Sequence, residues 1–163
     1  MKTQVQCEMA IAVPVDKIWE IVQDSMLLPR WMPNVDHTEI TTEQSKSVGE
    51  VRQCAVSMAG RSGQLVEQCV TFDPLEKISF KVQQDSFGFS RIIADLGYAL
   101  FLEPNDAGNT YIRLEYYYQE KGLIGRVLNK LMIKPHWNPL CLQMLDGLKQ
   151  FAEEGYANNG GSL

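Results

Sequence analysis

Between residues 49 and 119 the chain alternates apolar and polar residues in segments that only short turns separate. A period of two is typical of half-buried strands, because successive side chains of a strand point to opposite faces. Strands joined by short turns pair antiparallel, since a parallel pair needs a long crossover connection. The pattern therefore predicts an antiparallel meander that needs an apolar cover over one face.

The same alternation places the individual strands. A first strand is expected at 3–13 and ends at Pro14, and the others are expected at 35–43, 49–58, 63–72, 77–83, 91–104 and 110–119. Between the first two strands, "VDKIWEIVQD" has a helical apolar stripe, and Asp16 near its start suits the helix dipole. "SMLLPRWMPNV" carries two prolines and predicts a second, short and irregular helical turn.

The cover for the sheet is expected from the last segment, which begins at Gly122. It has two helical apolar stripes, the first formed by Ile124, Val127, Leu128 and Leu131 and the second by Cys141, Met144, Leu145, Leu148 and Phe151. "KPHWNP" lies between them, and its two prolines each remove a helical hydrogen bond. We expect either two helical pieces with a sharp kink or one long helix preceded by a shorter one. The fold class is therefore α+β.

Length and composition predict one domain over residues 1–154 and a flexible tail at 155–163. The net charge of −5 argues against a general nucleic-acid binder, because phosphate contacts need a basic face. The N-terminus lacks the apolar run of a signal peptide, and no stretch of about 18 apolar residues could span a bilayer. A cytoplasmic location is expected.

The four cysteines, Cys7, Cys54, Cys69 and Cys141, are widely spread and form no CxxC pair. Free thiols are expected in a cytoplasmic protein, with a disulfide between two of them as the alternative. His37 and His136 are too few for most zinc sites, and the chain has no phosphate loop, nucleophile elbow or dinucleotide fingerprint. No metal and no cofactor are expected.

Several short segments resemble those of a known family. They are the Pro14-x-Asp16 entry into a helix with Ile18-Trp19, the Pro29/Trp31 pair, "VGEVRQ" at 48–53, "FDPLEKISFKV" at 72–82 and the closing "LDGLKQFAE". Together with the order of elements, they resemble the polyketide cyclase/dehydrase and lipid-transport family of the START-like (SRPBCC) superfamily. The resemblance extends over residues 3 to 154.

This resemblance implies a helix-grip fold, in which a curved antiparallel sheet of six to seven strands wraps around the long C-terminal helix. A large, mostly apolar cavity would lie between them. The leading interpretation is a protein that carries or senses a hydrophobic or aromatic small molecule or a lipid. The alternatives are a cyclase or dehydratase acting on a polyketide-like substrate, and a protein-interaction module with a filled cavity. Whether the chain is an enzyme stays open.

Four residues are candidates for catalysis. His136 could act as a general base or could be a surface histidine at the proline kink. Arg52 could hold a ligand oxygen if it faces the cavity, or could pair with Glu67 or Gln68 on the neighbouring strand. Tyr98 and Tyr116 could present hydroxyls inside an apolar space or be ordinary core tyrosines.

The predicted ligand-binding set contains three of these candidates and several apolar or aromatic residues. Its members are Trp31, Arg52, Phe80, Tyr98, Leu100, Tyr116, Trp137 and Met144. The entrance is expected between the Trp31 turn and the "KPHWNP" kink.

One further pattern concerns partners. Lys121, Arg126, Lys130 and Lys134 recur at about four-residue spacing beside an apolar stripe. They indicate either an amphipathic element that touches a membrane transiently or the solvent-exposed face of a helix gripped by the sheet.

Overall fold

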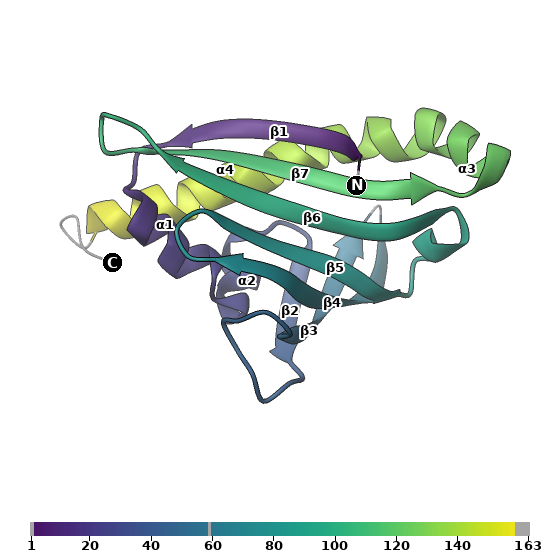
Figure 1. The fold of residues 1–163 in the computed structure, drawn as a ribbon, viewed down its shortest axis with the longest axis horizontal. Helices are drawn as coiled ribbons and strands as arrows, with labels where there is room; N and C mark the ends of the chain where they lie inside the picture. Colours follow the sequence, from purple (N-terminus) through teal and green to yellow (C-terminus); the bar gives the residue numbers. More distant parts are fainter. Residues whose placement is uncertain (1, 59, 159–163) are drawn as a thin grey trace.

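The computed structural model describes residues 2–58 and 60–158 and confirms the α+β helix-grip architecture (Figure 1). Within this part of the chain, seven antiparallel strands form one sheet in the order β1-β7-β6-β5-β4-β3-β2. The strands are β1 (Thr3–Ile11), β2 (Val35–Ile40), β3 (Val51–Met58), β4 (Arg61–Asp73), β5 (Lys77–Asp85), β6 (Ile93–Pro104) and β7 (Thr110–Glu120). Consecutive strands from β2 to β7 are neighbours, as a meander requires, and β1 pairs with β7.

Short helices occupy the connection between β1 and β2, as predicted. They are α1 (Val15–Val22), the 3-10 turn η1 (Ser25–Leu27) and α2 (Leu28–Trp31), and a second 3-10 turn, η2 (Phe89–Arg91), precedes β6. α2 crosses the C-terminal helix closely, because a Cβ atom added to Gly147 would lie 2.2 Å from the carbonyl oxygen of Trp31. Only glycine therefore fits at this crossing.

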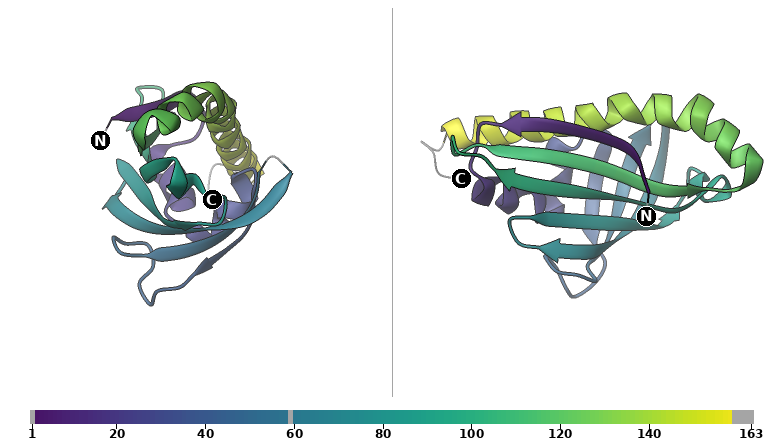
Figure 2. Two further views of the ribbon diagram at one scale, coloured as in Figure 1. Left: turned by 90° about the vertical axis from the view of Figure 1, so that its right-hand side faces the viewer. Right: turned by 45° about the horizontal axis from the view of Figure 1, so that its top comes forward.

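The C-terminal segment forms a continuous helical arm that lies across the sheet (Figure 2). It consists of α3 (Gly122–Leu128), a π-helical turn η3 (Asn129–Ile133) and α4 (Lys134–Asn158). The shorter-helix alternative is thus correct, and "KPHWNP" causes no break, although Pro139 lies inside α4. No helix in the described residues is long and apolar enough to cross a membrane.

The end of α4 differs from the expected domain boundary. The helix continues to Asn158, so four residues of the predicted flexible tail are helical. The rest of that tail, 159–163, lies outside the described residues. α4 buries the second predicted stripe through Cys141, Met144, Leu145 and Leu148.

The first predicted stripe does not cover the sheet, and this prediction is wrong. Ile124, Val127 and Leu131 are exposed, while Gly125, Asn129 and Ile133 face inward. A Cβ atom at Gly125 would lie 2.6 Å from the carbonyl oxygen of Ile92, so this face of α3 lies directly on the backbone before β6. Close approach at a glycine, rather than burial of the apolar stripe, sets the rotation of α3.

The expectation of free thiols is wrong for two of the four cysteines. Cys7 on β1 and Cys141 on α4 form a disulfide between residues 134 positions apart in the sequence. Cys54 and Cys69 are free and buried. The pairing depends on how α4 lies against β1, which the spacing of cysteines does not reveal.

Candidate functional site

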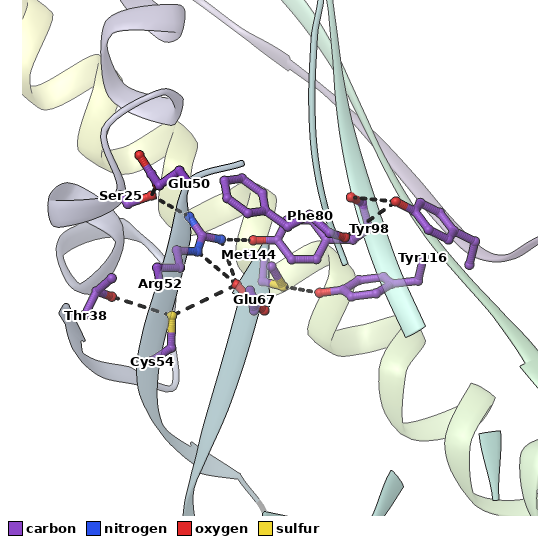
Figure 3. A network of polar contacts seen from close by, with 11 residues as sticks. Ser25, Thr38, Glu50, Arg52, Cys54, Glu67, Phe80, Tyr98, Tyr116 and Met144 are labelled. Atoms are coloured by element: carbon purple, nitrogen blue, oxygen red, sulfur yellow. Dashed lines mark hydrogen bonds and ion pairs between the residues drawn. The ribbon is translucent and has the colours of Figure 1, made fainter. Parts of the chain in front are cut away.

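The polar centre of the core is an ion pair between neighbouring strands (Figure 3). Arg52 on β3 lies opposite Glu67 on β4, and its side chain is 1% exposed. Its Nε and Nη2 atoms donate hydrogen bonds to Glu67 Oε2 at 2.9 and 2.8 Å. The Phe80 ring covers the guanidinium, with 3.6 Å between Cζ and the ring centroid. Arg52 therefore faces inward and pairs with Glu67, which was one of the partners expected from the sequence.

Arg52 makes two further hydrogen bonds. Nη1 donates to Ser25 Oγ at 3.1 Å, and Nη2 donates to the hydroxyl oxygen of Tyr98. Ser25 in turn donates to the buried carboxylate of Glu50. Burial alone would lower the pKa of Arg52, but Tyr98 and Glu67 beside it outweigh burial and raise that pKa above its ordinary value. Arg52 is a paired cation of the core.

A cavity of about 90 Å³ lies beside this network, between the sheet and α4. Its walls are mostly apolar, and they include Leu28, Met32, Val35, Val56, Met58, Leu65, Val82, Phe89, Leu96, Trp137, Leu140 and Met144. Polar groups of the same lining come from Asn34, Cys54, Glu67, Tyr98 and Tyr116, and the last three lie beside the ion pair. An apolar enclosure with a few convergent polar groups is the usual form of a small-molecule site.

Each polar group of the lining has a distinct capacity. Among the described residues, no group donates a hydrogen bond to Glu67 Oε1, and this oxygen is not fully enclosed. Tyr98 accepts from Arg52, so its own proton is available to a ligand. The Tyr116 hydroxyl donates to Met144 Sδ at 2.7 Å, and a thioether is a weak acceptor. Glu67, Tyr98 and Tyr116 thus offer one strong acceptor and two phenol donors.

The pKa values of these groups favour hydrogen bonding over proton release. Burial raises the pKa of Tyr98 well above its ordinary value and raises that of Tyr116 as well. Burial also raises the pKa of the Cys54 thiol to about 11. All three groups are therefore protonated at neutral pH. The described residues contain no cluster of three His, Cys, Asp or Glu side chains that could hold a metal ion.

A wider vestibule of about 500 Å³ adjoins the cavity. The two spaces share Met58, Phe89 and Trp137, and His136 lines only the vestibule. Aromatic rings run from the vestibule inward, with centroid separations of 5.6 Å for Phe89–Trp137, 5.3 Å for Trp137–Tyr116 and 5.7 Å for Tyr116–Tyr98. Trp137 and Phe89 separate the vestibule from the cavity.

The predicted site residues fall into three groups. Tyr98, Tyr116, Trp137 and Met144 line the cavity, Arg52 and Phe80 lie behind its wall, and Trp31 and Leu100 are buried in the core outside the lining. From the sequence, Glu67 was expected only as a possible partner for Arg52. Its alternation with buried Cys69 on β4 was the available signal that its carboxylate faces inward.

Comparison with solved structures agrees with the fold. The structure is similar to an aromatase/cyclase, Zhui, from Streptomyces sp. R1128 (TM-score 0.77, 18% identity, 97% of each chain covered). It is also similar to a START superfamily protein from Mycobacterium smegmatis (TM-score 0.75, 16% identity, 94% of this chain and 99% of that chain covered). A major latex-like protein 151 from Panax ginseng gives a TM-score of 0.70 at 14% identity, covering 90% of this chain and 95% of that chain.

These structural likenesses establish the fold, and the sequence adds the family. No curated protein matches the sequence. The family described as polyketide cyclase/dehydrase and lipid transport matches over residues 2–153, which is nearly the whole chain. The chain therefore belongs to the polyketide cyclase/dehydrase and lipid transport family.

Proposed function

We propose that this protein binds a small, mostly apolar or aromatic molecule in the cavity between the sheet and α4. The observation that carries the proposal is the convergence of Glu67, Tyr98 and Tyr116 in a lining that is otherwise largely apolar. The cavity of about 90 Å³ speaks against the alternative of an interaction module with a fully packed core. It is smaller than the roughly 300 Å³ of typical ligand pockets, so a bound molecule would extend toward the vestibule past Trp137.

The polar groups specify one feature of the ligand. Glu67 Oε1 needs a hydrogen-bond donor, whereas the guanidinium of Arg52 lies behind the cavity wall with four of its five N–H groups bonded to Glu67, Ser25 and Tyr98. A buried carboxylate also repels a second carboxylate. The preferred ligand is therefore a neutral molecule with a hydroxyl or amino group on an apolar body.

Isothermal titration calorimetry with three related probes tests this proposal. The probes are 2-naphthol, 2-methoxynaphthalene and 2-naphthoate, which share one ring system and differ in donor and charge. Binding of 2-naphthol should exceed that of 2-methoxynaphthalene by about 10- to 100-fold, because a hydrogen bond to a charged acceptor contributes about 1.5–3 kcal/mol. Absence of binding by all three probes, or tightest binding of 2-naphthoate, would contradict the proposal.

A second candidate function is a cyclase or dehydratase, and the same convergence of polar groups favours it. Glu67 could accept a proton from a carbon next to a substrate carbonyl, while Tyr98 donates a hydrogen bond to that carbonyl oxygen. Deuterium exchange of a bound β-diketone in D2O, followed by mass spectrometry, tests this step. If the parent protein exchanges the diketone no faster than the Tyr98→Phe variant does, the proton-transfer step is absent and binding remains the proposed function.

We also propose a cytoplasmic location. In that reducing compartment the Cys7–Cys141 disulfide would be opened to two thiols. Alkylation of thiols in freshly lysed host cells, followed by mass spectrometry, measures their state. Quantitative recovery of the intact disulfide would argue for an oxidising compartment instead.

A further inference from the structure

Exposed apolar side chains gather on α3 and η3 rather than being scattered over the molecule. Of the eleven large hydrophobic side chains exposed in the described residues, five lie within positions 123–132. They are Leu123, Ile124, Val127, Leu131 and Met132, which are 76%, 73%, 55%, 68% and 63% exposed, and we call them the α3–η3 face. A contiguous apolar patch of this kind marks an interaction site.

The inward face of the segment explains why this patch is exposed. Asn129 is buried, accepts a hydrogen bond from the Tyr118 hydroxyl and donates one to Glu120. Gly125 lies against the carbonyl oxygen of Ile92. A buried hydrogen-bonded asparagine and a close-packed glycine therefore dock the helix, and its apolar stripe is turned away from the core.

Charge distinguishes the surroundings of this face from the rest of the chain. Between residues 120 and 136 there are four basic side chains, Lys121, Arg126, Lys130 and Lys134, and one carboxylate, Glu120. The whole chain carries a net charge of −5, so the segment has the opposite sign to the protein. An apolar stripe flanked by lysine and arginine is typical of helices that lie in the interface of anionic bilayers.

The α3–η3 face lies close to the vestibule. Leu128, Met132 and Ile133, from the same segment, line the vestibule. α3 lies at the end of the molecule remote from the C-terminal end of α4 (Figure 1). A flat surface in contact with the α3–η3 face would therefore lie beside the mouth of the vestibule.

We propose that the α3–η3 face docks on anionic lipid bilayers, with its apolar side chains in the acyl boundary and Arg126 and Lys130 at the headgroups. A second copy of this chain fits less well. A symmetric dimer through this face would bring the same basic residues of two copies together. This proposal goes beyond ligand binding in the cavity and does not depend on it.

Sedimentation with ligand-free vesicles tests the proposal on the full chain. The vesicles contain phosphatidylcholine with or without phosphatidylglycerol, and the bound fraction is measured at low and high salt. Binding should require phosphatidylglycerol and should weaken as salt rises, because salt screens headgroup charges. Since no cavity ligand is present, failure here would leave the cavity proposal untouched.

Matched variants separate the α3–η3 face from general effects. Leu131→Asp should weaken binding by about 10-fold or more, because burial of a leucine side chain is lost. Leu142→Asp makes the same change at an exposed position of α4 and should leave binding unchanged. Arg126→Gln with Lys130→Gln should weaken binding by about 10-fold or more, whereas Lys2→Gln with Lys149→Gln, which has equal net charge, should have a much smaller effect.

Two results would overturn the proposal. One is equal sedimentation with both kinds of vesicle and with the Leu131→Asp variant. The other is absence of vesicle binding together with a dimer in analytical ultracentrifugation that Leu131→Asp dissociates, which would identify the face as a self-association surface.

Discussion

Arg52 is stable in the core because each of its nitrogen atoms has an acceptor. Nε, Nη1 and Nη2 are satisfied by Glu67, Ser25 and Tyr98, and the Phe80 ring covers the guanidinium plane. Taking a charge out of water costs several kcal/mol, which only such complete pairing offsets. The network therefore holds Glu67 and Tyr98 in fixed positions on the cavity wall.

Removing one partner of the Arg52–Glu67 ion pair should reveal the cost of burying the other charge alone. We expect Arg52→Met to lower the free energy of unfolding by about 3–5 kcal/mol, because Glu67 would be left as an unpaired buried carboxylate. Urea denaturation measures the change. The double variant Arg52→Met/Glu67→Met should recover a large part of the loss, and a single variant as stable as the parent protein would contradict this account.

The buried thiols predict how stability depends on pH. Burial raises the pKa of Cys54 and of Cys69 to about 11, whereas thiols in an unfolded chain titrate near about 8.5. Between these values the folded state binds more protons than the unfolded state, so stability falls as pH rises. Their contribution is fully present below about pH 8.5 and is lost as pH approaches 11.

Urea denaturation at a series of pH values above 8 measures this decline. Cys54→Ala should flatten it by up to about 1.4 kcal/mol per pH unit, the slope expected for one thiol. Burial likewise raises the pKa of Tyr98 and Tyr116, so a further decline is expected above about pH 10. A free energy of unfolding that is constant or increases between pH 9 and 11 would show that the thiols are not buried as described.

At the scale of elements, α3 and α4 belong to one helical arm but are held in different ways. α4 buries an apolar stripe against the sheet, whereas Gly125 of α3 and Asn129 of η3 lie against the backbone and side chains beside them. The π-helical turn at 129–133 lies between them. A π turn shifts the register of the helix, so the two stripes read from the sequence do not share one face.

The disulfide between β1 and α4 should contribute to the stability of the fold. Cys7 and Cys141 close a loop of 134 residues, which restricts the unfolded chain. We expect the Cys7→Ala/Cys141→Ala variant to lose about 2–4 kcal/mol of unfolding free energy under oxidising conditions. Thermal denaturation with and without a reductant checks this. If reductant lowers the melting temperature of the variant as much as that of the parent protein, the disulfide is not the cause.

On the scale of the whole molecule, the cavity lies beside the Arg52–Glu67 ion pair, and the vestibule lies nearer to α3. Trp137 belongs to both linings and its ring contacts Phe89, Tyr116 and Tyr118. His136, the next residue, lines only the vestibule and has an exposed side chain. These neighbours therefore make separable contributions to ligand entry.

We expect His136→Ala to leave binding of 2-naphthol unchanged and Trp137→Phe to weaken it. Trp137 supplies wall area to both spaces, and an aromatic pair is worth about 0.5–1.5 kcal/mol beyond the area it buries, or roughly 2- to 10-fold in affinity. Calorimetry at constant pH gives the affinities, and a thermal melt of each variant confirms that it is folded. A loss of binding confined to His136→Ala would indicate that the histidine contacts the ligand.

Much of the secondary structure of this protein is determined by residues close together in the sequence. Alternation with a period of two, turn residues and prolines act within a few positions, so the seven strands and the short helices after β1 follow from the residues themselves, whereas the inward side of β3 does not. The inward position of Tyr116 on β7 does follow from this alternation. The resemblance added the curvature of the sheet and the helix that it grips.

What only the tertiary structure decided depends on contacts between distant segments. The Cys7–Cys141 disulfide, the role of Glu67 as a cavity carboxylate and the separation of the cavity from the vestibule each join elements far apart in the sequence. The exposed α3–η3 face has the same origin. Hydrophobic periodicity predicts that a helix has an apolar side, but whether that side faces the core depends on which neighbour approaches it, and here a backbone carbonyl against Gly125 settles the rotation.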